Sequence, residues 1–116
     1  MSGAIRDLVS KNCVPCKGAK PMTVEEAGLV LRDLLGWSLD NAAIMKEFRF
    51  KSYLAGLDFS YAMGKIAEEQ DHHPDMIVRW RRVKLVFSTH SIGGLSQNDF
   101  IMAAKSELEY ERFSSR

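Results

Sequence analysis

Three histidines are the residues of this sequence best suited to acid/base chemistry. His72 and His73 are adjacent in the stretch EEQDHHPD at 68–75, and His90 stands alone further along the chain. Histidine is the side chain whose ordinary pKa, about 6.5, lets it gain or lose a proton near neutral pH. Adjacent histidines can serve an acid/base site or a metal site, or they can be an accidental pair at a helix end.

Zinc binding and thiol chemistry are the competing interpretations. Zinc needs three or four ligands, and adjacent residues such as His72 and His73 seldom direct both rings at one ion, so we expect no metal. Cys13 and Cys16 have the spacing of a zinc or redox pair. Without a second pair or a neighbouring histidine they cannot complete a structural zinc site within one chain. We expect this cysteine pair to be functionally silent, with metal binding and redox exchange as the alternatives.

The composition is that of one small globular domain. The chain has 116 residues, 46% hydrophobic and 27% charged, and a formal net charge of +1. This charge gives no strong attraction to phosphate, so nucleic acid is not an expected partner. The apolar runs are too short for a membrane span, and the N-terminal residues lack the apolar stretch of a secretory signal. Two cysteines make no disulfide framework, and we expect a cytoplasmic protein.

Capping residues and hydrophobic periodicity divide the chain into elements that must position the histidines. Thr23 and Glu26 form a capping box at the start of one helix, and Ser96 and Asp99 form another at the start of the last helix. The predicted elements are, in chain order, helix 23–36, strands 37–40 and 44–50, helix 52–70, strands 76–80 and 83–87, a loop at 90–94 and a helix from 96 onward.

This order, α-β-β-α-β-β-α, predicts an α+β fold. Two hairpins form a four-stranded antiparallel sheet, and three helices pack on one face of it. Residues 1–22 lack sustained periodicity and contain glycine and proline, so we expect an extended lead-in there. Residues 23–116 are expected to form a single domain.

The long helix at 52–70 carries two apolar stripes. One has the spacing of a core stripe, at Phe59, Ala62, Met63, Ile66 and Ala67. The other falls on a different side of the helix, at Tyr53, Leu54, Leu57 and Tyr61. Either two core layers meet this helix, or the second stripe is a subunit interface, because exposed apolar patches tend to mark contacts.

The histidines lie where these elements end. Pro74 stops the long helix, so His72 and His73 lie where the chain leaves it for a strand. His90 follows the last strand, and we expect Asp99, in the first turn of the last helix, to lie near it. The four side chains then either converge on one cleft, or the histidines are ordinary helix-end and loop residues and Asp99 is only a cap.

The pattern as a whole resembles the signature of the pterin-4a-carbinolamine dehydratases. The matching positions have this spacing: Glu68-x3-His72-His73-Pro74-x5-Trp80-x9-His90-x8-Asp99. The similarity covers about residues 23–110, nearly the whole predicted domain. It implies dimers that join sheet edges and, in some members, tetramers that pair through the long helix.

The resemblance also implies an activity. Members dehydrate the 4a-hydroxytetrahydropterin left by aromatic amino-acid hydroxylases and give the quinonoid dihydropterin, with no metal or organic cofactor. Some animal members also bind a transcription factor, so a protein-binding or transcriptional-cofactor module with little or no catalysis is the alternative. The cysteine pair lies in a segment that resembles an extension of bacterial-type members, outside the signature.

The resemblance assigns roles to residues of this chain. His72 and His90 are expected to transfer protons, and His73 is expected to hold the pterin ring. The carboxylates expected to orient or charge the imidazoles are Glu68, Asp71 and Asp99. The residues expected to contact substrate are His73, Pro74, Thr89 and Ser91. One position departs from the pattern, because Asn98 stands where animal members tend to carry arginine.

Overall fold

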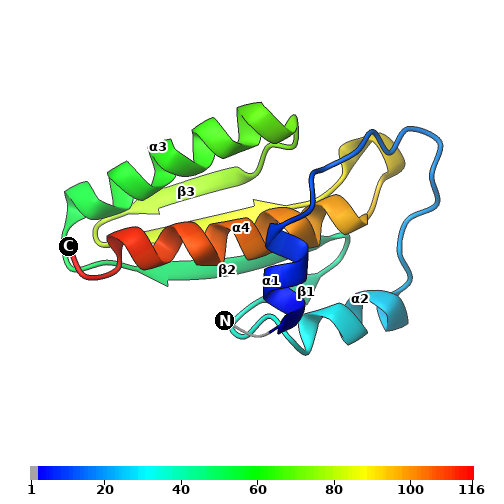
Figure 1. Ribbon diagram of the computed structural model, residues 1–116, viewed down its shortest axis with the longest axis horizontal. Coiled ribbons are helices and arrows are strands. Elements are labelled where there is room, and N and C mark those ends of the chain that lie inside the picture. Colours follow the sequence, from blue (N-terminus) through cyan, green and yellow to red (C-terminus); the bar gives the residue numbers. More distant parts are fainter. Residues whose placement is uncertain (1–2) are drawn as a thin grey trace.

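A computed structural model describes residues 3–116 and contains one four-stranded antiparallel sheet (Figure 1). Its strands are β1 (Ser38–Asp40), β2 (Ala43–Arg49), β3 (Asp75–Arg79) and β4 (Arg82–Phe87). They are arranged in the order β1-β2-β4-β3, so β4 pairs with both β2 and β3. The predicted pair of hairpins in one antiparallel sheet is confirmed.

The helices are α1 (Gly3–Val9), α2 (Val24–Leu31), α3 (Tyr53–Gln70) and α4 (Gln97–Phe113), with a short 3-10 helix, η1 (His90–Ile92). The predicted count of three α-helices was therefore wrong, and the order is α-α-β-β-α-β-β-α. The expected loop at 90–94 contains η1.

The additional helix, α1, lies in the segment that was predicted to be extended. Ile5, Leu8 and Val9 have helical spacing, and Leu8 is buried. The other two pack against the core, and α1 contacts α4. A helix of 7 residues is marginal by itself, so packing against α4 must stabilise it. Residues 1 and 2 of the predicted lead-in lie outside the described residues.

Local capping sets the starts of α2 and α4 as expected, but α2 ends at Leu31, before the stop predicted at Gly36. Both capping boxes form, at Thr23 with Glu26 and at Ser96 with Asp99. The residue that caps the end of α3 is Asp71, which adopts a left-handed conformation with φ 52°. This turn redirects the chain immediately before the two adjacent histidines.

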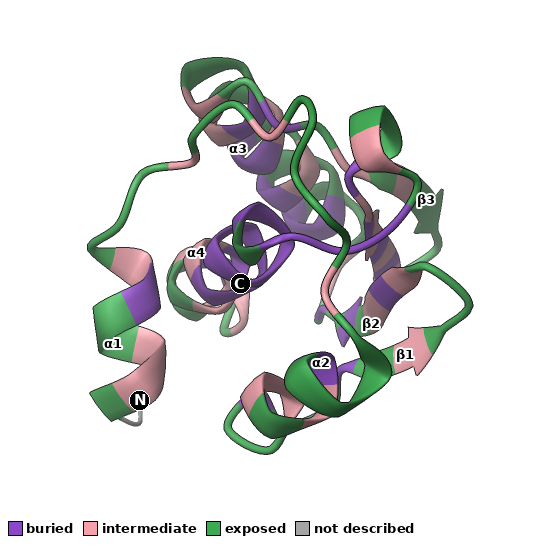
Figure 2. Ribbon diagram, turned by 90° about the vertical axis from the view of Figure 1, so that its right-hand side faces the viewer, coloured by how far each residue is buried: buried purple, intermediate pink, exposed green. Residues whose placement is uncertain are grey.

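The core lies between the sheet and the helices α3 and α4 (Figure 2). Alternate residues of β2 and β4 face it, so that the large buried side chains of the sheet are Ile44, Phe48, Val83, Leu85 and Phe87. The helices contribute Phe59, Met63, Phe100, Ile101 and Met102. Of the predicted core stripe on α3, only Ile66 is not fully buried.

The second apolar stripe of α3 is not part of the core. Tyr53, Leu54, Leu57 and Tyr61 have exposed fractions of 48%, 68%, 37% and 72%. The explanation that two core layers meet this helix is therefore wrong for this chain, and a subunit interface stays a prediction. Within residues 3–116, no helix combines the length and apolar character needed to cross a membrane.

Candidate active site

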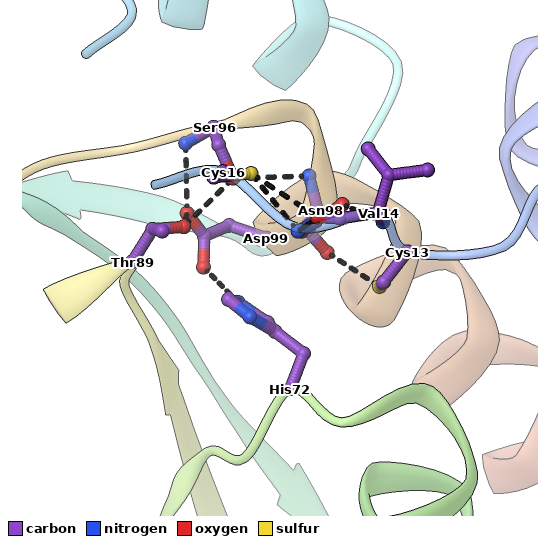
Figure 3. Close-up of polar contacts among 8 residues, drawn as sticks. All are labelled: Cys13, Val14, Cys16, His72, Thr89, Ser96, Asn98 and Asp99. Carbon is purple, nitrogen blue, oxygen red and sulfur yellow. Dashed lines mark hydrogen bonds and ion pairs between the residues drawn. The ribbon is translucent and has the colours of Figure 1, made fainter. Parts of the chain in front are cut away.

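The centre of the candidate site is a buried pair formed by His72 and Asp99 (Figure 3). His72 lies just beyond the end of α3, where its N–H donates to Ala67 O at 3.1 Å. Its ring Nε2 lies 2.7 Å from Asp99 Oδ1, in the first turn of α4. His72 is 9% exposed, and Asp99 is fully buried. The pair therefore joins the C-terminal end of α3 to the N-terminal end of α4.

The second oxygen of the Asp99 carboxylate is held by the turn that caps α4. Oδ2 accepts from the Ser96 backbone N–H at 2.9 Å and from the Thr89 hydroxyl at 2.8 Å. Because the Thr89 hydroxyl donates to Asp99, the Ser96 hydroxyl must donate to Thr89, 2.7 Å away. Asp99 is thus a helix cap and also a partner of the histidine ring.

This network fixes which nitrogen of His72 carries the proton. A carboxylate only accepts hydrogen bonds, so the neutral His72 ring donates to it from Nε2. The other nitrogen, Nδ1, is then left with the lone pair that can take up a proton. The geometry has the parts of a carboxylate-oriented general base.

The neighbouring His73 has a different environment. Its Nε2 lies 2.9 Å from Glu68 Oε2 on the last turn of α3, and both side chains are exposed. His73 and Glu68 line an open pocket of about 430 Å³ together with Tyr61, Gly64 and Lys65. The two adjacent rings therefore interact with carboxylates of different helices.

His90 is exposed at the start of η1, and its side chain makes no hydrogen bond or ion pair with any residue of the 3–116 range. Asp99 was expected to lie near His90. Its carboxylate contacts His72, Thr89 and Ser96, and among the described residues it makes no hydrogen bond or ion pair with the His90 side chain. Thr89 directly precedes His90, so the network ends one residue from this third histidine.

The loop that carries His90 is closed by its own backbone. Thr89 N–H donates to Gly94 O at 2.9 Å, and Gly94 N–H donates to Thr89 O at 3.4 Å. Gly94 is so close to Pro21 that an added Cβ would lie 2.7 Å from the proline Cβ. This loop is therefore also packed against the segment that precedes α2.

The remaining predicted site residues lie around these histidines. Asp71 and Ser91 are exposed, and neither side chain has a hydrogen-bond partner within the described part of the chain. Pro74 is half-buried between His73 and β3. Thr89 was predicted to contact substrate, but its hydroxyl is buried and bonded to Asp99 and Ser96.

The structure brings further residues to the site that the sequence did not single out for it. Ser96 was predicted only as a cap, yet its backbone and hydroxyl both support the Asp99 network. Asn98 and Gln70 bind residues 12–16, which include the cysteine pair. The only sequence signal at these positions was the departure of Asn98 from the family pattern.

The cysteines lie beside this network and not in it. Both thiols are free, and burial raises the pKa of the Cys13 thiol to about 11. A thiol with such a pKa is protonated near neutral pH and is a poor nucleophile. Among residues 3–116, no group of three or more His, Cys, Asp or Glu side chains is placed to hold a metal ion.

Comparisons with known proteins agree with this arrangement. A model of the family described as pterin 4 alpha carbinolamine dehydratase matches residues 20–108. A relative from Nitrosospira multiformis, whose name places it in the same family, is 42% identical and aligns over 96% of this chain and 99% of its own length. Pterin-4-alpha-carbinolamine dehydratase 2, mitochondrial, from Arabidopsis thaliana is 43% identical over 93% of this chain and 62% of its own length.

Solved structures show the same fold. A crystal structure from Brucella melitensis, described as a transcriptional coactivator/pterin dehydratase, superposes with a TM-score of 0.74 at 33% identity and covers 78% of this chain and 98% of its own. A pterin dehydratase-like protein identified as a RuBisCO assembly factor has a TM-score of 0.53 at 19% identity, a likeness of fold alone. The match over most of the chain shows that this protein belongs to the pterin-4-alpha-carbinolamine dehydratase family, whose members are lyases.

Proposed function

We propose that this chain dehydrates 4a-hydroxytetrahydropterin to the quinonoid dihydropterin by histidine acid/base catalysis. The observation that carries the proposal is the buried His72–Asp99 pair, with Nε2 and Oδ1 2.7 Å apart. The pair supports the proposal because Asp99 orients the ring through Nε2 and leaves the Nδ1 lone pair to accept a proton. The family membership of the chain supplies the substrate class.

The reaction requires two proton transfers. The hydroxide that leaves C4a must receive a proton, and a nitrogen of the pterin ring must lose one. His72 takes part through Nδ1, because Asp99 occupies its Nε2. His90, exposed on the loop beside Thr89, is the second proton-transfer group. Well-placed groups of this kind each contribute roughly 10²–10⁴-fold.

The other residues bind the pterin or hold the histidines. His73, paired with Glu68 at an open pocket, holds the ring. Asp71 and Pro74 flank His72 and His73, and Ser91 follows His90. Pro74 and Ser91 contribute to substrate binding, and Asp71 adds negative charge near the histidines. Thr89 acts on Asp99, since its hydroxyl is already committed there.

The test is the decay of 4a-hydroxytetrahydropterin, followed by ultraviolet absorbance with and without the protein. The expected result is a saturable acceleration that is lost in the His72→Ala variant. A parent protein that leaves the spontaneous rate unchanged would end the enzyme proposal.

A protein-binding role on the same scaffold is the second candidate. It is favoured by the exposed stripe Tyr53, Leu54, Leu57 and Tyr61, and by the name of the Brucella protein, which includes a coactivator. Co-purification of the chain with a partner that the Leu57→Glu variant no longer retains would support it.

We propose that the same stripe joins copies of this chain into a dimer or tetramer.

The physiological setting follows from the substrate. We propose that the chain recycles the pterin cofactor of an aromatic amino-acid hydroxylase, the class of enzyme that produces the 4a-hydroxy compound. The cytoplasmic location stays a prediction, and the name of the Arabidopsis relative assigns that protein to the mitochondrion.

A further inference from the structure

Residues 12–16 cross the two helix ends that carry the His72–Asp99 pair. We call this segment the N-terminal strap. Figure 3 shows three of its residues, Cys13, Val14 and Cys16, gathered around Asn98 beside that pair. The strap therefore connects the same two elements that the His72–Asp99 hydrogen bond connects.

Asn98 holds the strap at the start of α4. Its Oδ1 accepts from Val14 N–H at 3.0 Å, and its Nδ2 donates to Val14 O at 2.6 Å. The same Nδ2 lies 3.1 Å from Cys16 Sγ, which accepts from it. The amide thus pairs with one residue of the strap as a neighbouring strand would, through both backbone groups. Asn98 is 5% exposed, whereas its partner Val14 is 61% exposed, so these bonds are partly buried.

Gln70 holds the strap at the end of α3. Its Oε1 accepts from Cys13 N–H at 2.7 Å, and its Nε2 donates to Asn12 Oδ1 at 3.0 Å. Gln70 is the last residue of α3 and precedes His72 by two positions, and Asn98 directly precedes Asp99. Each anchor is therefore next to one member of the pair.

We propose that Asn98 and Gln70 are positioning residues, which act through the strap to hold His72 and Asp99 in register. The kinetic test of this proposal rests on the proposed function. The structural test rests only on the His72–Asp99 hydrogen bond, which sets the ring form of His72. The His72–Asp99 hydrogen bond and the packing of α3 against α4 already join the two helix ends, and the strap adds hydrogen bonds to both of them. A displacement of about 1 Å of a catalytic group can lower the rate by about 10²-fold.

Contribution to stability alone is the competing role. Losing a buried amide that makes three bonds destabilises a protein whatever the site does. The two roles differ in what happens to the His72 ring in molecules that remain folded. A stability role leaves the ring and kcat unchanged in the folded fraction, whereas a positioning role changes both.

The experiment compares Asn98→Ala and Gln70→Ala with the parent in the full chain. Gln97→Ala is the matched control, because Gln97 is exposed in the same first turn of α4 and its side chain has no hydrogen-bond partner among residues 3–116. Nuclear magnetic resonance of protein labelled with nitrogen-15 reports which nitrogen of the neutral His72 ring is protonated. Dehydration kinetics give kcat and KM for the same samples.

In the parent, we expect a single His72 form with the proton on Nε2. Asn98→Ala should give a mixture of both ring forms and lower kcat about tenfold, with KM changed by less than about twofold. Gln70→Ala should also give both ring forms and a lower kcat. The double variant should lose less kcat than the product of the two single losses, because both residues act through one strap. Gln97→Ala should match the parent.

Folded Asn98→Ala protein with one ring form and unchanged kcat would overturn the proposal and leave the dehydratase function standing. If Asn98→Ala does not fold, Gln70→Ala decides by the same two readouts. An inactive parent would end the proposed function alone, since the ring form of His72 in the variants still tests the strap.

Discussion

His72 and His73 are neighbours in the chain, yet their rings are held by carboxylates of two different helices. His72 Nε2 lies 2.7 Å from Asp99 Oδ1 in α4, and His73 Nε2 lies 2.9 Å from Glu68 Oε2 in α3. One pair is buried, and the other is exposed. We propose that this difference separates a proton-transfer role from a binding role, because Asp99 fixes the ring form of the buried His72 while the exposed His73 remains open to a ligand.

The first prediction concerns the three histidines. His72→Ala and His90→Ala should each lower kcat by about 10²-fold, because each removes a proton-transfer group. His73→Ala should raise KM more than it lowers kcat, since this ring mainly holds substrate. The double variant of His72 and His90 should lose much less than the product of the single losses. Equal, small effects at all three positions would contradict the assignment.

The second prediction separates the two tasks of Asp99. Asp99→Asn should lower kcat by about 10²-fold or more, because an amide can no longer fix the ring form of His72. Glu26→Gln is the matched control, since Glu26 holds the same position in the capping box of α2. The control should leave kcat unchanged, and an Asp99→Asn enzyme with parental kcat would reduce Asp99 to a helix cap.

The third prediction concerns assembly. The Leu57→Glu, Tyr61→Glu double variant should have a lower mass in light scattering than the parent, because buried carboxylates would disrupt an apolar interface. Its helix content should not change, since both side chains are exposed in the single chain. Leu29→Glu on α2, also exposed, is the control expected to keep the parental mass. Identical masses for parent and double variant would assign the stripe to ordinary surface.

The fourth prediction concerns the cysteines. The Cys13→Ser, Cys16→Ser double variant should retain dehydration, because the backbone bonds of Val14 and Cys13 to Asn98 and Gln70 remain and a serine hydroxyl can replace each thiol contact. A tenfold loss of rate would contradict this expectation, as would stoichiometric zinc in the parent protein.

The Cys13 thiol should also show its raised pKa directly. Burial raises it from 9.0 to about 11, so the neutral thiol contributes stability below pH 9, and that contribution is lost as the pH rises from 9 to 11. Alkylation of Cys13 near pH 8, followed by mass spectrometry, should be slower in the native than in the denatured protein. Equal rates would show that the thiol is not shielded.

The fifth prediction compares two glycines. Gly94→Ala should lower the thermal midpoint and kcat together, because its Cβ would lie 2.7 Å from Pro21 Cβ and displace the loop that carries His90. Gly28→Ala is the control of opposite sign, since open space surrounds this position inside α2. It should stabilise the protein by about 0.5–1 kcal/mol. A tolerated Gly94→Ala would show that the loop can move without loss.

The sequence by itself determined the order of the α-helices and strands from α2 onward and the candidates for chemistry, but not the end of α2 or the short helix η1. Local patterns predict features that depend on residues close together in the chain. These features are the two capping boxes, the end of α3 near Pro74 and the alternation in the strands. Helix α1 was missed because its short apolar pattern becomes stable only against α4, a contact between the two ends of the chain.

Only the tertiary structure decided which groups meet. Asp99 and His72 are 27 positions apart, and Asn98 and Val14 are 84 apart. No local periodicity links such residues. Their contact depends on where the end of α3, the start of α4 and residues 12–16 come to lie once the apolar faces are buried against the sheet. Burial of those faces is a property of the whole chain, which is why the sequence could name the histidines and could not say which carboxylate holds each one.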